Sequence, residues 1–236
     1  MKIKYSICTN RLTLTALLLT VTGIFTGIFA QIQNNSVTDV DGNTYKTVVI
    51  GSQEWMKENL KTTKFNDKSD IQNITDPREW ARATSYAYSW YNNNISNKDI
   101  YGALYNWPAV NTGKLCPAGW RVPTDEDWSK LIDFLGGSDL AGGKLKEINN
   151  STWNPPNRGA TNESGFSAIP GGYRFGNYWY PGDFYEQGIN SYWWSGTEYT
   201  ESHAWSRTVN NERTKVYRSF FIKNSGFSVR CIKNDR

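Results

Sequence analysis

Few residues of the sequence have the types and spacing that catalysis requires. The single histidine, His203, stands in TESHAWSR beside Ser202, but no serine is framed as in a nucleophile elbow. An exposed or structurally bonded histidine is therefore favoured over a Ser-His-Asp triad, and one histidine also falls short of a zinc ligand set. A carboxylate pair for glycoside hydrolysis stays open, because the sequence does not give the separation of two acids. We expect no catalytic residue, no metal and no cofactor.

The segment RFGNYWYPGDFYEQGIN has the composition of a binding surface. Adjacent aromatic residues stand amid Gly, Pro, Asn, Asp and Glu, without the alternation of a strand. Consecutive rings cannot all face one core, so we expect some of them on the surface of a loop, although the loop could instead cover a small core of its own. Flat rings beside carboxylate and amide groups suit stacking on a sugar ring or anchoring a protein. The predicted contact residues are Tyr178, Trp179, Tyr180, Asp183, Tyr185, Glu186 and Asn190.

The turn in TVNNERTKVYR is a second candidate for ligand contact. Its polar residues crown a predicted hairpin, where a solvated tip without function has the same composition. The residues concerned are Asn210, Asn211, Glu212, Arg213 and Lys215.

The N-terminus has the pattern of an export signal. Three basic residues, Lys2, Lys4 and Arg11, precede an uncharged apolar run from Leu12 to Phe29. Ala30 offers a small residue before a cleavage point. We expect a signal peptide over residues 1–30 and a polar linker over 31–36, although an uncleaved membrane anchor has a similar length. Loss of the three basic residues lowers the formal charge from +4 to +1, which gives no basis for nucleic-acid binding. The domain over 37–236 is thus expected to be secreted or at the cell surface, without a membrane span.

Export changes how the three cysteines are interpreted. Cys8 belongs to the leader, so the mature chain keeps Cys116 and Cys231. Two thiols in an oxidising compartment most simply form one disulfide, here across more than 100 residues, which the chain-entropy model values at roughly 4–5 kcal/mol. The alternative is two free thiols buried as small hydrophobic side chains.

The segment from 124 to 137 contains the clearest helix signal. Thr124 is a candidate N-cap, and three acidic residues follow it in the first turn, where the helix dipole favours anions. Gly136 and Gly137 end the helix. Its apolar stripe consists of Trp128, Leu131, Ile132 and Leu135. A second helix, over 140–148, is less regular because it contains two glycines.

The remaining elements are predicted as short strands. VTDVDGNTYKTVVIG predicts a hairpin with an Asp41-Gly42 turn, and YGALYNWPAV predicts a half-buried strand stopped by Pro108. Further strands are expected over 166–169, 192–195, 204–209, 216–222 and 226–232. No domain boundary separates them from the helices. The prediction is one α+β domain of mostly antiparallel short strands, one or two helices and long loops.

Several motifs in a fixed order carry a family resemblance. They are DGNTYKTVVIGSQEWMKENL, YGALYNWPAV, CPAGWRVPTDEDW and GFSAIPGGYR, followed by YWWSGTE and GFSVRCIK. In this order they resemble the Fibrobacter succinogenes major paralogous domain, over about residues 37–234. The resemblance implies an exported bacterial protein, often surface-associated and usually without an assigned activity.

A more remote similarity is to the C-type lectin fold and its formylglycine-generating relatives. WRVPTDEDW is similar to a helix-start motif of the latter, and GFSVRC to their closing strand. The similarity implies a C-type lectin-like fold whose helical region is bridged to the last strand, a pattern that a Cys116–Cys231 bridge would fit. The sequence lacks the copper-binding cysteine pair of the enzymes and the calcium-site motifs of the lectins, so neither activity carries over.

The combined prediction is an exported, non-enzymatic binding or adhesion domain. Its ligand would be a glycan or another surface protein, bound through residues 178–190. The alternative is a structural or assembly component of the bacterial cell surface without a small-ligand site. An enzyme ranks third.

Overall fold

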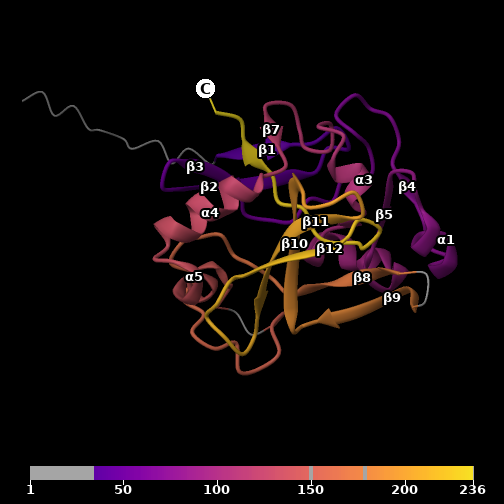
Figure 1. Cartoon of the computed structure of the whole chain (residues 1–236). Helices are drawn as coiled ribbons and strands as arrows, with labels where there is room; N and C mark the ends of the chain where they lie inside the picture. Colours follow the sequence, from indigo (N-terminus) through magenta and orange to yellow (C-terminus); the bar gives the residue numbers. More distant parts are fainter. Residues whose placement is uncertain (1–34, 149–150, 178–179, 236) are drawn as a thin grey trace, which may run out of the picture. The chain divides into compact units, whose positions relative to one another are not determined.

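The computed structural model describes residues 35–148, 151–177 and 180–235. The predicted signal peptide lies outside the described residues, and Ser36, the last residue of the predicted linker, already belongs to the first strand. The described part of the chain contains two five-stranded sheets, one three-stranded sheet and five α-helices (Figure 1). None of the described helices combines the length and the apolar character needed to cross a membrane.

The first five-stranded sheet joins the two ends of the domain. Its hairpin turns at Asp41-Gly42 as predicted, because the Asp39 carboxylate accepts hydrogen bonds from the Asp41 and Asn43 backbone N–H groups at 3.0 and 2.9 Å. The C-terminal strand lies in the interior of this sheet, between strands from residues 53–56 and 120–121. In pairing order the strands are β1 (Ser36–Thr38), β2 (Thr44–Ile50), β3 (Gln53–Met56), β13 (Ile232–Lys233) and β7 (Trp120–Arg121).

A disulfide links Cys116 to Cys231, as predicted, with 6.0 Å between the two Cα atoms. Cys116 stands four residues before β7, and Cys231 directly precedes β13. Both side chains are buried. The bridge therefore ties the segment before the main helix to the strand that closes the first sheet.

The second five-stranded sheet carries most of the C-terminal half. Its strands are antiparallel except for β8 and β10, which pair in parallel. The strands predicted over 192–195, 204–209 and 216–222 are confirmed with slightly different bounds. In pairing order the strands are β12 (Tyr217–Ile222), β11 (His203–Asn210), β10 (Asn190–Glu198), β8 (Gly171–Asn177) and β9 (Tyr180–Gln187).

Two predicted strands, over 166–169 and 226–232, are wrong. Ala168 makes only an isolated bridge to Lys146. In the second segment, Gly226, Phe227 and Ser228 bridge to three different neighbouring segments, so no continuous ladder forms. The apolar pattern of 226–232 reflects burial between elements and not membership of one sheet.

The predicted main helix is confirmed as α4 (Asp125–Phe134). Thr124 caps it, and the Asp127 side chain completes a capping box. Its apolar stripe is buried, with the Trp128 ring centroid 4.9 Å from that of Trp55 and 5.8 Å from that of Trp193. The second predicted helix is α5 (Ser138–Leu145), three residues shorter at its C-terminus than expected.

The segment YGALYNWPAV differs from its prediction as a half-buried strand. Only Leu104–Tyr105 form a strand, and Pro108 stands in the first turn of a helix, which Asn106 caps by accepting a hydrogen bond from the Ala109 N–H at 3.3 Å. Proline is well suited to a first helical turn, because that position needs no donor. The smaller elements of this region are α1 (Pro77–Arg82), α2 (Lys98–Tyr101), α3 (Trp107–Val110), two 3₁₀ turns (Tyr91–Asn93 and Ile95–Asn97), β4 (Gln72–Asn73), β5 (Ala87–Ser89) and β6 (Leu104–Tyr105).

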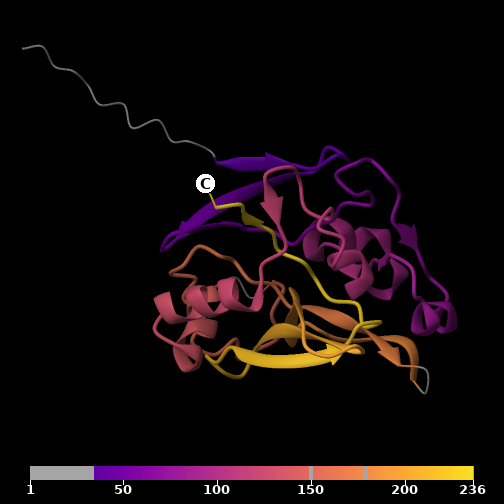
Figure 2. The ribbon, with the colours of Figure 1, turned by 45° about the horizontal axis from the view of Figure 1, so that its top comes forward.

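The two large sheets lie on different sides of the domain, with the C-terminal segment passing between them (Figure 2). Trp193 and Trp194 are successive residues of β10 and belong to different core clusters, so both faces of the second sheet are buried near its middle. We call the face that carries Trp194 the inner face, and the face that carries Trp193, under α4, the outer face. These features agree with the predicted α+β class; the lectin-like architecture stays a prediction.

Buried cations hold several loops. The Lys146 side chain is fully buried, and its ammonium group donates to the carbonyl oxygens of Arg158, Asn210 and Arg213 at 2.8, 2.9 and 2.9 Å. Burial lowers the pKa of Lys146 to about 8. The polar turn at 210–215 is thus fastened to the scaffold through its backbone.

Candidate binding surface

A buried arginine fixes the hairpin that contains the predicted contact residues. The Arg174 guanidinium, in β8, donates to the Gly182 and Thr75 carbonyl oxygens at 2.9 and 3.0 Å, and also to that of Ile74. It lies over the ring of Trp80 at 4.4 Å and that of Phe184 at 4.8 Å. Burial lowers the pKa of Arg174 to about 10, so the group keeps its charge at neutral pH. The β8–β9 hairpin is therefore anchored to the loop before α1.

The predicted 178–190 loop is largely a strand, which corrects the sequence interpretation. Tyr180–Gln187 form β9, and adjacent residues of a strand point to opposite faces. Phe184 lies against Arg174, while Tyr185 lies opposite Tyr173, with 5.5 Å between their ring centroids. The two consecutive aromatic residues thus have separate roles. The Phe184 ring packs against Arg174, and the Tyr185 ring is 38% exposed.

The partly exposed Tyr185 ring belongs to a row of aromatic side chains on the inner face. From Tyr173 the row continues to Tyr192 at 4.9 Å, then to Phe227 at 5.0 Å and Trp194 at 4.4 Å between ring centroids. Phe227 and Trp194 are fully buried. The Tyr185 ring therefore packs on side chains that belong to the core, so its side chain loses little conformational freedom when a ligand binds.

Glu186 completes the polar part of this surface. Its backbone is left-handed, with φ of 65°, which costs a non-glycine residue about 1–2 kcal/mol. One carboxylate oxygen, Oε2, accepts hydrogen bonds from the Tyr192 hydroxyl at 2.5 Å and from the Asn190 amide. Burial and then this carboxylate raise the pKa of Tyr192. Throughout the described residues Oε1 has no hydrogen-bond partner, so one acceptor is open beside the Tyr185 ring.

The structure places four of the seven predicted contact residues on two strands of the second sheet, and three of them, Tyr185, Glu186 and Asn190, belong to one surface. Asp183, Tyr185, Glu186 and Asn190 all lie on β9 or at the start of β10. Tyr180 begins β9, while Tyr178 and Trp179 lie outside the described residues. We call Tyr173, Tyr185, Glu186 and Asn190 the hairpin surface. Tyr173 comes from β8 and Asn190 from β10, and the pairing of these strands in the second sheet brings them to this surface. Tyr173 was not among the predicted residues because the sequence did not reveal this pairing.

The second predicted candidate, the turn over 210–215, has a structural explanation. Asn211 is buried, and its amide donates to the Asn154 and Pro155 carbonyl oxygens at 3.2 Å. The Asn210 side chain accepts hydrogen bonds from the next backbone N–H groups of the turn. These contacts, together with Lys146, account for the polar composition of the turn.

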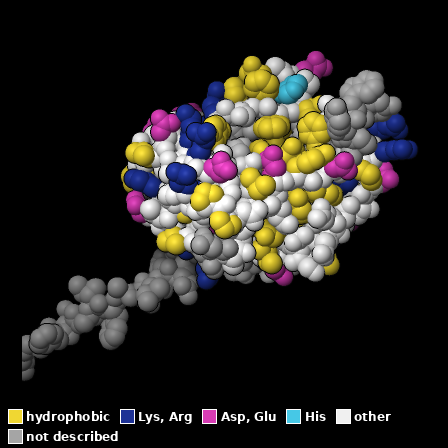
Figure 3. Space-filling view, turned by 90° about the horizontal axis from the view of Figure 1, so that it is seen from below, with side chains coloured by type: hydrophobic (Ala, Val, Ile, Leu, Met, Phe, Trp, Pro, Cys, Tyr) yellow, Lys and Arg dark blue, Asp and Glu magenta, His cyan; other side chains and the backbone are white. Residues whose placement is uncertain are grey.

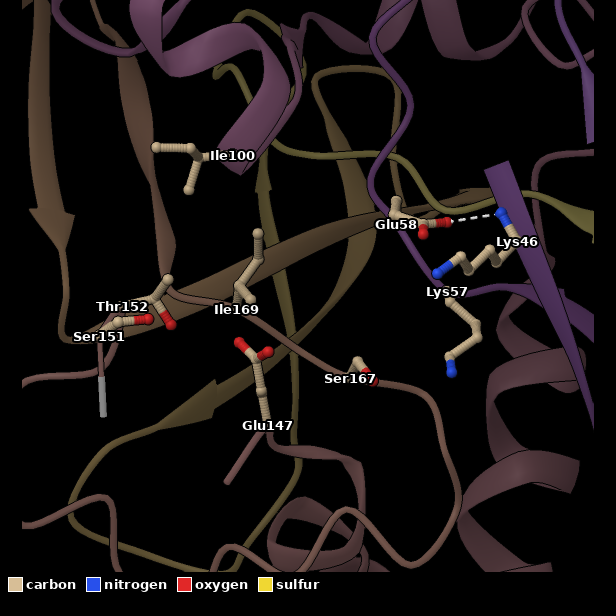
Figure 4. A pocket seen from close by; sticks show the side chains of 9 residues that line it. All are labelled: Lys46, Lys57, Glu58, Ile100, Glu147, Ser151, Thr152, Ser167 and Ile169. Atoms are coloured by element: carbon tan, nitrogen blue, oxygen red, sulfur yellow. Dashed lines mark hydrogen bonds between the residues drawn. The ribbon is translucent and has the colours of Figure 1, made fainter. Parts of the chain in front are cut away.

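A mixed-charge pocket of about 370 Å³ is a further feature that the sequence did not indicate (Figure 4). Two carboxylates, Glu58 and Glu147, line it together with Lys46 and Lys57, and Glu58 accepts a hydrogen bond from the Lys46 backbone N–H at 2.8 Å. Below them, burial lowers the pKa of Arg230 to about 9, against the opposing effect of the Glu58 and Glu147 charges. The charges of the two acids thus partly offset the effect of burial on this guanidinium.

The single histidine contacts hydroxyl groups of its own segment. The imidazole Nδ1 of His203 lies 2.8 Å from the Ser202 hydroxyl, its sequence neighbour, in an exposed turn. Across residues 35–235, apart from the undescribed gaps, no group of three or more His, Cys, Asp or Glu side chains is placed to hold a metal ion.

Sequence reasoning missed a second exposed aromatic group. Tyr199, Trp205 and Phe220 lie together on the outer face of the second sheet, with Tyr199 and Phe220 44% and 47% exposed. Trp205 is half-buried. The alternation of Arg218, Phe220 and Ile222 in β12 was the available signal, since it places Phe220 on a face that also carries a charge.

These features define the class of protein as an α+β domain with aromatic side chains exposed on both faces of one sheet. The model of the Fibrobacter succinogenes major domain matches residues 48–233. The chain belongs to this family, as its motifs indicated. A search of curated proteins and a search of solved structures each gave no match.

Proposed function

We propose that the chain is an exported, non-enzymatic binding domain with a C-type lectin-like fold, which recognises a glycan through the hairpin surface. The observation that carries this proposal is the position of the Tyr185 ring, which is 38% exposed and packs on Tyr173. A ring of this kind can stack on the apolar face of a sugar with little loss of conformational freedom.

Polar groups beside the ring supply the direction that stacking lacks. The open oxygen of Glu186 accepts hydrogen bonds, and the Asp183 carboxylate is exposed on the same hairpin. Sugar hydroxyls are donors that match such acceptors, and a hydrogen bond to a charged group contributes about 1.5–3 kcal/mol. The acidic character favours a ligand that is neutral or positively charged at this position.

A glycan array followed by titration calorimetry tests the proposal. The exported chain is compared with Tyr185→Ala, Tyr185→Phe and Glu186→Gln, and Tyr86→Ala serves as the matched control because Tyr86 is 50% exposed elsewhere. We expect Tyr185→Ala to weaken binding about tenfold or more, whereas Tyr185→Phe and the control retain most of it.

Two outcomes would contradict the proposal. Binding that survives both Tyr185→Ala and Glu186→Gln would remove the site assignment. The absence of binding to any glycan by the unaltered chain would favour a structural component of the cell surface instead.

A further inference from the structure

The second exposed aromatic group lies on the opposite face of the sheet from the hairpin surface. Arg207 is paired with Trp193 in one ladder and with Arg218 in the next, so all three side chains share the outer face. Two residues further along the same strands, Trp205 is paired with Phe220. We call Tyr199, His203, Trp205, Arg218 and Phe220 the outer patch.

The rings of the outer patch form a platform. Tyr199 and Phe220 are stacked, with 4.3 Å between ring centroids and 20° between ring planes, and Trp205 meets Tyr199 at 4.5 Å. The His203 ring stands edge-on to Phe220 at 5.6 Å. Hydrophobic side chains gather beside the single histidine in Figure 3. Adjacent exposed rings of this kind are typical of interaction surfaces in soluble proteins.

The charges at one end of the outer patch do not cancel. Arg207 and Arg218 share one carboxylate, Asp125, at 2.7 and 2.9 Å, so two guanidinium groups are balanced by a single anion. Burial raises the pKa of Asp125, but the hydrogen bonds and charges of Arg218 and Arg207 outweigh burial and lower it. The cluster therefore carries a net positive charge at neutral pH.

Arg218 presents this charge to solvent in a fixed orientation. Its Nε and Nη2 atoms donate to Asp125, and its guanidinium carbon lies 3.3 Å from the centroid of the Trp205 ring. The side chain is 47% exposed. Nη1 of Arg218 has no acceptor within the described part of the chain. A donor with a positive charge is thus held beside a flat aromatic surface.

We propose that the outer patch is a second binding surface, specific for a carboxylated saccharide, in which a uronate ring packs against Phe220, whose ring is stacked on Tyr199, and its carboxylate binds Nη1 of Arg218. Charge complementarity favours this ligand, because an anion neutralises the excess charge of the two arginines. Arginine is suited to the role since its planar donors match a carboxylate. The hairpin surface, which carries the Glu186 carboxylate, would repel the same ligand.

Titration calorimetry with two matched probes tests this second surface. A hexamer of galacturonic acid carries the carboxylates, and its methyl ester keeps the sugar rings without the charge. The unaltered chain is expected to bind the acid about tenfold or more tightly than the ester. Arg218→Gln should abolish this preference, and Phe220→Ala should weaken binding of both probes about tenfold.

Matched variants separate the possible results. Lys130→Gln, which removes another exposed cation from α4, should leave binding of both probes unchanged, and so should Tyr185→Ala, which affects only the hairpin surface. Loss of acid binding in Tyr185→Ala would overturn the proposal, as would equal affinity of the unaltered chain for both probes or no binding of either. Arg218→Lys, which can retain the pair with Asp125, shows whether any loss reflects folding. Self-association in sedimentation that Phe220→Ala abolishes would assign the outer patch to a second copy and overturn the proposal.

Discussion

Removal of the Cys116–Cys231 disulfide tests the architecture most directly. The change is the double variant Cys116→Ala, Cys231→Ala, in which two buried sulfur atoms are replaced by hydrogen. The bridge spans 115 residues, for which the loop-closure relation gives a loss of about 4.8 kcal/mol in the free energy of unfolding at 25 °C. Because domains have total stabilities of about 5–15 kcal/mol, this loss is a large fraction of the whole.

The structure also predicts where the loss is felt first. Cys231 accepts a hydrogen bond from the Met56 N–H at 3.0 Å, and β13 follows it directly in the interior of the first sheet. We therefore expect hydrogen exchange to increase first around β3, β13 and β7. Strands β10 and β11 should keep their protection longer, because they pair with each other without β13.

Equilibrium denaturation in urea provides the measurement. The oxidised chain, the same chain after reduction and the double alanine variant are compared, and the reduced chain serves as the control for the lost sulfur atoms. The loop-closure reasoning would be refuted if the free energy of unfolding fell by less than about 1 kcal/mol in both the reduced and the substituted chains. Such a small loss would mean that the unfolded chain is already restricted without the bridge.

Two other predictions concern single groups. Arg174→Met leaves three buried carbonyl oxygens without their donor, so urea denaturation should show a loss of about 3 kcal/mol or more in the free energy of unfolding. The control Arg78→Met, at an exposed position of α1, should be nearly neutral. Equal effects of the two variants would show that the buried guanidinium does not anchor the hairpin. Hydrogen bonds from arginines lower the pKa of Asp125 and Asp127 despite the opposing effect of burial, so their contribution to stability is present above pH 4 and is lost as the pH falls through the folded-state pKa values. Thermal denaturation between pH 7 and pH 2 should therefore show a smaller decline in melting temperature for Asp125→Asn, Asp127→Asn than for the unaltered chain; an identical decline would contradict the assignment.

Local sequence signals were sufficient for prediction where the structure of a segment is determined by its own residues. Helix α4 was predicted because its cap, its acidic first turn and its apolar stripe lie within twelve residues. The first hairpin was predicted because an Asp-Gly turn joins two alternating segments. The disulfide followed from the count of cysteines in an exported chain, which requires no geometry.

Prediction from the sequence failed where contacts between distant segments determine the structure. Residues 226–232 look like a strand because most of them are buried, but three of them bridge to three different partners. Strand β9 was taken for a loop because three aromatic residues in succession, 178–180, are followed in the sequence by Pro181 and Gly182, which hides the alternation of the residues that follow. Part of the hairpin surface was therefore predicted by composition, and its geometry, through Tyr173 and the left-handed Glu186, was not.

Three of the buried cations, Lys146, Arg174 and Arg230, bind backbone oxygens in the manner of a coordinated metal ion. A dissociable ion leaves its ligands when its free concentration falls, whereas a side chain keeps an effective concentration that the fold itself sets. The loops that Lys146 and Arg174 hold can thus vary in side-chain sequence, since the hydrogen bonds to these two groups come from backbone carbonyl oxygens. Their conformation would stay the same in surroundings where the supply of ions fluctuates.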